Sequence, residues 1–242
     1  MNKFLSVVLS ILAFTCTSMF FYESAQAQTD QLIKAEIQKK LGSNAKVRSV
    51  SPAPVSGLYE VLVGNEIFYT DSSGKYLIQG EIIELASGKN ITEQRQADLN
   101  RIKWTDLNQA NAFKTVRGSG TRQVAIFSDP NCGYCKRLEK SLQQLDNVTI
   151  YTYLIPILSA DSTQKSKQIW CSADPNKAYI DWMINGVIPS GKTDCSNPLD
   201  KNLTFAKTYG VTGTPTLFFT DGSRFPGAVQ ITDIEKKFAS LK

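Results

Sequence analysis

The spacing of hydrophobic and polar residues divides the chain into segments of different periodicity. Residues 4–21 are largely apolar without a regular period, whereas residues 30–41 carry apolar side chains at helical spacing. From residue 57 to residue 85, short apolar and aromatic runs alternate with turn signals such as Gly64-Asn65. This last segment predicts an antiparallel meander with tight turns between its strands.

The N-terminal apolar run has the features of a secretory signal peptide over residues 1–27. Lys3 supplies a positive charge before the run, and the small residues of Ser24–Ala27 supply a cleavage site. An uncleaved membrane anchor is the alternative, but Ser, Thr and Cys interrupt a run that is barely long enough to span a bilayer. We therefore expect the mature protein to be exported, a setting in which disulfides persist.

A small domain is predicted for residues 28–91, with one helix and the antiparallel meander. A sheet of this size buries little apolar surface by itself, and its edges and apolar face are suited to binding a second copy. We therefore expect a dimerisation domain and a homodimer; a subdomain folded onto the rest of the same chain is the alternative. Residues 92–115 begin with a stretch that is polar on all faces, which predicts a helical linker.

The last part of the chain, residues 116–242, contains two cysteines separated by two residues in the run "DPNCGYCKRLEK". Cys135, Leu138, Leu142 and Leu145 recur at helical spacing, so Cys135 is expected to lie buried on the inner face of a helix. Cys132 then falls at the helix N-terminus, where unpaired N–H groups stabilise an anion. The pattern predicts an accessible Cys132 thiolate that attacks disulfides and a buried Cys135 that resolves them.

Two other interpretations of this cysteine pair were considered. A structural zinc site needs a second such pair or histidine ligands, and the chain contains no histidine. An inert crosslink would close so small a loop that its stabilisation is slight. The other two cysteines of the mature chain, Cys171 and Cys195, are far apart in sequence and are predicted to form a structural disulfide, with a second redox pair as the alternative.

Composition limits the remaining classes of function. The net charge of +5 is small and not clustered, so nucleic acid is not an expected partner. The absence of histidine excludes Ser-His-Asp and Cys-His catalysis. The predicted chemistry uses sulfur alone, so neither a metal nor another cofactor is expected.

The order of elements in the C-terminal part is that of a thioredoxin-like domain. A buried strand precedes the cysteines, a strand and a helical insertion follow them, and Pro215 opens a strand that leads through a hairpin into a last helix. With "CGYC", the "GVTGTP" run and the small N-terminal domain, the chain resembles the DsbC/DsbG family of periplasmic disulfide isomerases. The whole chain is thus predicted to be an α+β protein with a dimerisation domain, a linker helix and a catalytic domain.

The resemblance has further implications for function. It implies a homodimer with an uncharged cleft for misfolded, disulfide-containing exported proteins, and a membrane reductase of the DsbD type that keeps Cys132 and Cys135 reduced. It also implies a cis peptide before Pro215 and contact of Thr214 with the cysteines. We expect Gly133, Tyr134, Thr214 and Pro215 to bind substrate. The residues "SDPN" before Cys132 differ from the best-known member of the family.

Three functional classes remain open from the sequence. The first is a disulfide isomerase with chaperone activity, the second a thiol oxidase or a DsbG-like reductase, and the third a non-catalytic chaperone. No histidine lies between Cys132 and Cys135, where strongly oxidising relatives have one, which favours the isomerase.

Overall fold

The computed structural model describes residues 27–43 and 45–241. The predicted signal peptide lies outside these ranges except for Ala27. Within them, no helix has the length and apolar character needed to cross a membrane. The chain forms two compact units, which meet in sequence between Gln96 and Ala97.

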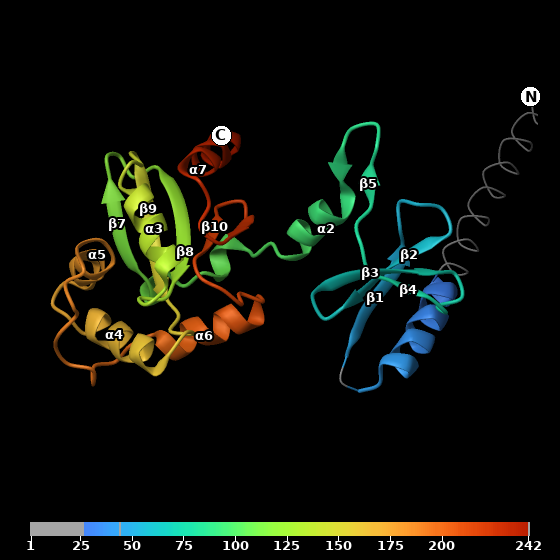
Figure 1. Ribbon diagram of the computed structural model, residues 1–242, viewed down its shortest axis with the longest axis horizontal. Coiled ribbons are helices and arrows are strands. Elements are labelled where there is room, and N and C mark those ends of the chain that lie inside the picture. Colours follow the sequence, from blue (N-terminus) through green and yellow to red (C-terminus); the bar gives the residue numbers. More distant parts are fainter. Residues whose placement is uncertain (1–26, 44, 242) are drawn as a thin grey trace, which may run out of the picture. The chain divides into compact units, whose positions relative to one another are not determined.

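The N-terminal unit is a small antiparallel sheet with one helix, residues 27–41, packed against it (Figure 1). The sheet has four strands in sequence order, β1 (Val47–Pro52), β2 (Leu58–Val63), β3 (Glu66–Asp71) and β4 (Leu77–Ile78). Ile33 and Ile37 of the helix contact Val47, Val50 and Val61 of the sheet, and all five side chains are buried. The predicted meander is thereby confirmed.

A short hairpin follows the four-stranded sheet. It consists of β5 (Ile83–Glu84) and β6 (Lys89–Asn90), which pair antiparallel and lead directly into helix α2 (Ile91–Leu99). Apolar side chains on and near β4 and β5 remain exposed, and Leu85 keeps 94% of its surface exposed. The N-terminal unit therefore has an uncovered apolar surface beside its edge strand.

The linker helix predicted for residues 92–115 is wrong in its extent. Helix α2 ends at Leu99, and the chain then forms two 3-10 turns, Trp104–Asp106 and Gln109–Asn111, before the next strand. The cause is tertiary contact: Ile102 and Leu107 are buried in the core of the C-terminal unit. The Ile102 N–H donates to the Gly222 carbonyl, and a side chain at Gly222 would overlap the Ile102 backbone. Burial of these apolar residues outweighs local helix propensity.

The C-terminal unit contains a five-stranded mixed sheet with the strand order β11-β10-β8-β9-β7 (Figure 1). Its strands are β7 (Phe113–Arg117), β8 (Arg122–Ser128), β9 (Val148–Leu154), β10 (Thr216–Phe219) and β11 (Arg224–Pro226). Strands β8 and β9 are parallel, and the other pairs are antiparallel. This is the predicted thioredoxin-like arrangement, in which the strand before the cysteines lies at the centre of the sheet.

Helices cover both faces of the central strand β8. Val124 and Ile126 contact one cluster, to which α3 (Gly133–Leu142) and α7 (Ile231–Ser240) contribute, whereas Ala125 and Phe127 contact a second cluster with α6 (Leu199–Thr208). Successive side chains of a strand point to opposite faces, so an uninterrupted apolar run is buried on both sides. The start of α3, directly after β8, is thus held in place by two cores.

The predicted helical insertion lies between β9 and β10. It contains α4 (Ala160–Trp170), α5 (Pro175–Asn185) and α6. Tyr179 and Met183 of α5 are buried in a third cluster, which also contains Cys132 and Cys135. The insertion therefore forms part of the environment of the two cysteines.

Candidate active site

Cys132 is the N-cap residue of α3. Its backbone is extended, with φ −74° and ψ 115°, and its Sγ accepts a hydrogen bond from the Cys135 N–H at 3.3 Å. An N-cap side chain satisfies one of the unpaired N–H groups of the first helical turn, a task in which a thiolate can replace the usual oxygen. The spacing of two residues between the cysteines therefore brings the Cys135 N–H onto the Cys132 sulfur.

The turn that leads into α3 is anchored by Asp129. The fully buried carboxylate accepts hydrogen bonds from the Asn131 N–H at 2.8 Å and from the Ile157 and Leu158 N–H groups at 2.9 and 3.0 Å. It thus ties the turn to the segment after β9. No role was predicted for Asp129, although an Asp at the end of a strand often accepts from the backbone N–H two residues later in an Asx turn.

Thr214 and Pro215 lie against Cys132, although they are distant in sequence. The peptide bond between them is cis, as the resemblance implied. The Cys132 thiol donates to the Thr214 carbonyl at 3.2 Å. The Thr214 Oγ1 is buried and has no hydrogen-bond partner among the described residues. The structure therefore brings Thr214 and Pro215, called the proline loop below, together with Cys132 and Cys135.

The expected accessibility of Cys132 is wrong. Cys132 keeps only 5% of its surface exposed, compared with 2% for Cys135. The proline loop at Thr214 covers the sulfur, a contact that helical periodicity does not reveal. Gly133 and Tyr134, the two residues between the cysteines, are exposed, and Tyr134 keeps 59% of its surface. Cys132 itself is therefore buried, and the exposed surface at this point of the chain is that of Gly133 and Tyr134.

The two thiols nevertheless differ in acidity. The pKa of Cys132 is lowered to about 6, chiefly because the Cys135 side chain hydrogen-bonds its thiolate, with further lowering by Thr214 and by the N–H groups of Cys135 and Tyr134, against the opposing effect of burial. Burial raises the pKa of Cys135 far above its ordinary value. The direction predicted for Cys132 agrees with the structure, but its largest cause is the neighbouring thiol.

Lys136 and Arg137, the two basic residues that follow Cys135, lie over aromatic rings. The Lys136 Nζ is 3.7 Å from the centre of the Trp182 ring, and the Arg137 guanidinium is 4.3 Å from that of Tyr134. The Trp182 Nε1 donates to the Pro130 carbonyl at 2.6 Å. Trp182 therefore connects α5 to the turn before Cys132 and to the first turn of α3.

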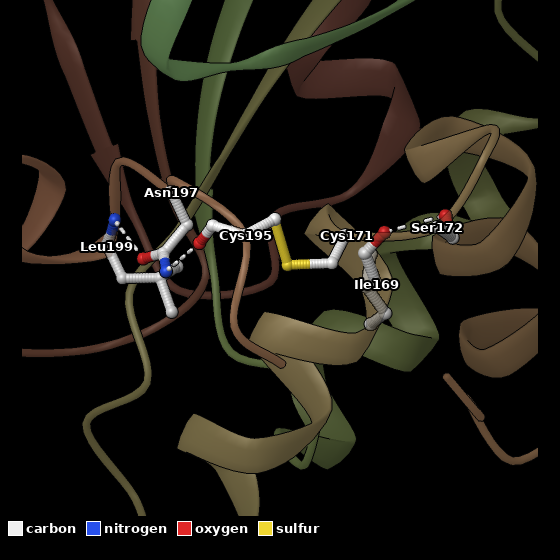
Figure 2. The surroundings of a disulfide bond; sticks show 6 residues. All are labelled: Ile169, Cys171, Ser172, Cys195, Asn197 and Leu199. Atoms are coloured by element: carbon white, nitrogen blue, oxygen red, sulfur yellow. Dashed lines mark hydrogen bonds between the residues drawn. A yellow bond between two sulfur atoms is a disulfide. The ribbon is translucent and has the colours of Figure 1, made fainter. Parts of the chain in front are cut away.

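Cys171 and Cys195 form a disulfide with an S–S distance of 1.99 Å (Figure 2). Cys171 is the C-cap of α4, and Cys195 precedes α6. Two of their neighbours, Ile169 and Leu199, belong to the buried cluster around the active-site cysteines. The disulfide thus fastens the insertion close to the core beneath the site.

In the described part of the chain, no three His, Cys, Asp or Glu side chains are grouped so that they could hold a metal ion.

Comparisons with known proteins agree with this architecture. Residues 109–242 match the family described as "Thioredoxin-like domain", and residues 23–93 match the "Disulfide bond isomerase protein N-terminal domain". The chain is also similar to the crystal structure of a disulfide interchange protein from Neisseria gonorrhoeae, with 37% sequence identity and a TM-score of 0.53 over 55% of this chain and 97% of that one. Fold and cysteine pair thus define a protein of the thioredoxin-like class.

Relatives over most of the chain identify the family. The probable thiol:disulfide interchange protein DsbC of Bordetella avium is 36% identical over 219 residues, which cover 89% of this chain and 78% of the relative. The Bordetella pertussis protein of the same name is 40% identical over 75% of this chain, and the match spans 64% of the relative's length. The chain belongs to the DsbC family of thiol:disulfide interchange proteins.

Proposed function

We propose that the chain is a periplasmic disulfide isomerase that rearranges or reduces incorrect disulfides in exported proteins. The observation that carries the proposal is the pairing of Cys132, whose pKa is lowered to about 6, with the buried Cys135 of raised pKa. At neutral pH the first sulfur is mostly thiolate, the reactive form, and the second keeps its proton. Membership of the DsbC family supports the same activity.

The reaction starts when the Cys132 thiolate attacks one sulfur of a wrong substrate disulfide. A mixed disulfide forms, and the other substrate sulfur leaves as a thiolate. In isomerisation, a substrate thiolate then attacks the substrate sulfur of the mixed disulfide, and Cys132 is released without net oxidation. In reduction, Cys135 attacks the Cys132 sulfur, the substrate leaves with two thiols, and the Cys132–Cys135 pair is oxidised.

The substrate is expected to bind as an extended segment beside Cys132. Thr214 contacts the sulfur, and the exposed Gly133 and Tyr134 follow Cys132 in sequence. Main-chain pairing with the Thr214 segment would hold many different sequences, because backbone groups are common to all of them. The same tolerance supports a chaperone activity toward unfolded chains.

The proposal includes an electron donor outside the chain. After a reductive cycle the oxidised cysteine pair must receive two electrons before it can attack again. A membrane reductase of the DsbD type, which the family resemblance suggests, would supply them. The predicted signal peptide, residues 1–27, would bring the protein to the compartment where such clients occur.

We also propose that the N-terminal unit forms a homodimer. Support comes from the edge strand β4 and from exposed apolar side chains near it, namely Tyr76, Leu77, Ile78, Ile83 and Leu85. An unpaired strand edge with apolar neighbours is a site for pairing with another chain.

Sedimentation equilibrium of residues 28–242 should give twice the monomer mass, and Leu85→Glu should weaken the association. Val55→Glu, at another exposed apolar position, should leave it unchanged; a monomeric wild type would contradict the proposal.

Trapping of intermediates tests the proposed chemistry. With Cys135→Ser, the mixed disulfide on Cys132 has no internal thiol to resolve it, so covalent adducts with scrambled, disulfide-containing substrates should accumulate while some isomerisation continues. Non-reducing electrophoresis with and without dithiothreitol measures the adducts. The matched control, Cys132→Ser combined with Cys135→Ser, should form none. Turnover without any trapped adduct in Cys135→Ser would show that Cys135 does not resolve mixed disulfides.

A further inference from the structure

The four residues Asp129–Cys132 form a β-turn that leads into the cysteine helix. The Cys132 N–H closes the turn by donating to the Asp129 carbonyl at 3.0 Å. Pro130 occupies the second position, where its fixed φ is favourable, and Asn131 occupies the third. The conformation of this turn therefore sets the direction in which the chain delivers Cys132 to the start of α3.

A β-turn with proline at its second position has two common forms, which differ by a rotation of the central peptide. In type II the third residue has a positive φ, and the carbonyl of the second residue points to the opposite side of the turn from its direction in type I. Among the described residues other than glycine, only Asn147 has a positive φ, so this turn is not type II. Asparagine nevertheless tolerates a positive φ, so Asn131 by itself leaves the rotated form accessible.

Side chains hold both ends of the central peptide, Pro130–Asn131. The Asn131 N–H donates to the Asp129 carboxylate at 2.8 Å, and the Trp182 Nε1 donates to the Pro130 carbonyl at 2.6 Å. Pro130 is buried, so its carbonyl needs a hydrogen-bond partner within the protein. The indole of Trp182 supplies this partner in the observed orientation of the peptide.

Contacts from three helices fix the Trp182 ring in this place. Trp182 belongs to α5, and the Nζ atoms of Lys136 in α3 and Lys165 in α4 lie 3.7 and 5.0 Å from the centre of its ring. Lys165 also forms an ion pair with Asp161, which accepts a hydrogen bond from the Asn131 Nδ2 at 2.7 Å. The ring is thus held between α3 and the insertion while its N–H contacts the turn.

We propose that Trp182 is a positioning residue for the nucleophile: its N–H holds the Pro130–Asn131 peptide in the orientation that places the Cys132 sulfur on the N-terminus of α3. There the sulfur accepts a hydrogen bond from the Cys135 N–H at 3.3 Å. Rotation of the peptide would turn Cys132 away from this N–H, so its thiolate would be less stabilised and less abundant. This inference rests on the proposed function, because it concerns the reactivity of the attacking sulfur.

Trp182→Phe removes the N–H and keeps an aromatic ring at this position. In protein of residues 28–242 with a reduced active-site pair, alkylation by iodoacetamide, an uncharged reagent, reports the Cys132 thiolate. At pH values below the Cys132 pKa of about 6, the rate should fall about fivefold, the factor that corresponds to one hydrogen bond of ordinary strength. At alkaline pH, where the thiol is fully ionised, the rate should reach that of the wild type. Peptide mass spectrometry follows the alkylation of Cys132 alone.

Position 131 tests the rotation of the peptide directly. In Trp182→Phe, the additional change Asn131→Thr should restore most of the rate, because a β-branched residue disfavours a positive φ. The additional change Asn131→Gly should lower the rate further, because glycine adopts a positive φ readily. Both changes remove the amide that donates to Asp161, so the difference between them reports the preference of the backbone.

The matched control is Trp170→Phe, at another half-buried tryptophan that packs against the same buried cluster as Trp182. It should leave the pH profile unchanged. None of these substitutions alters a charge, since Lys136, Lys165 and Asp161 are retained, so a changed electrostatic field cannot explain a shift of the profile. Thermal unfolding checks the fold of each variant. If Trp182→Phe is unfolded, benzothienylalanine at position 182, which keeps the bicyclic ring and has sulfur in place of the N–H, replaces it.

The possible outcomes are distinct. An unchanged pH profile in Trp182→Phe, or an equal shift in Trp170→Phe, would overturn the role of Trp182. Equal rates for the double variants with Asn131→Thr and with Asn131→Gly would also overturn it, because rotation of the peptide would then not be the cause. In each of these cases the cysteine chemistry would stand. A wild type whose Cys132 reacted with the pH dependence of an ordinary thiol would instead overturn the proposed function.

Discussion

Replacing Cys132 by serine should abolish the reactivation of scrambled ribonuclease. A serine hydroxyl cannot replace the thiolate, because it neither ionises near neutral pH nor forms a disulfide. Cys135 cannot take over, since burial raises its pKa and leaves it 2% exposed. Recovery of ribonuclease activity in a glutathione buffer measures the effect, and the variant should not exceed the buffer alone.

The control for this variant is Thr212→Ala, an exposed position close to the proline loop that has no part in the proposed chemistry. It should reactivate ribonuclease at the wild-type rate. Serine is close to cysteine in size, so the thermal unfolding of Cys132→Ser should stay near that of the wild type. Turnover by a folded Cys132→Ser protein would refute the assignment of Cys132 as the nucleophile.

Loss of the disulfide between Cys171 and Cys195 should cost the protein much of its stability. The two cysteines are separated by 24 positions in sequence, and the disulfide closes the loop between them. Without the disulfide, this loop is free in the unfolded chain, which gains conformational entropy. In the chain-entropy model this corresponds to a fall of about 3.5 kcal/mol in the free energy of unfolding. Urea unfolding of Cys171→Ala combined with Cys195→Ala, compared with the wild type under oxidising conditions, measures the change.

Reduction provides the matched control for the disulfide. Wild-type protein unfolded in dithiothreitol should approach the stability of the double variant, whereas dithiothreitol should not affect the variant itself. The resolving chemistry should survive in the folded variant, because Cys132 and Cys135 remain. If the free energy of unfolding fell by less than about 0.5 kcal/mol, the range of neutral surface substitutions, the disulfide would not stabilise the fold.

Local patterns predicted the parts of the site that depend on a few adjacent residues. The stripe formed by Cys135, Leu138, Leu142 and Leu145 is buried as expected, although α3 ends at Leu142 and Leu145 follows it. The alternation of strand and turn signals predicted the N-terminal meander. In both cases the signal and its structural cause lie within one element, so periodicity is sufficient.

Contacts between distant segments were not accessible from these patterns. The cover over Cys132 comes from Thr214, 82 residues later, and the anchoring of Asp129 depends on N–H groups beyond β9. The end of α2 at Leu99 depends on burial of Ile102 against other elements. Each case is decided by tertiary packing, which local propensity does not encode.

The proline loop that covers Cys132 also has a consequence for when catalysis stops. With so little of the sulfur reachable, a target bond must be carried to it on a strand that is free to bend, and a bond fixed inside a finished fold cannot make that approach. In the proposed function, a substrate protein that has reached its native packing would therefore stop reacting without any signal from the enzyme. Folding of the substrate would then end the reaction, because the buried Cys132 could no longer reach native disulfides, whereas disulfides in unfolded chains would stay within its reach.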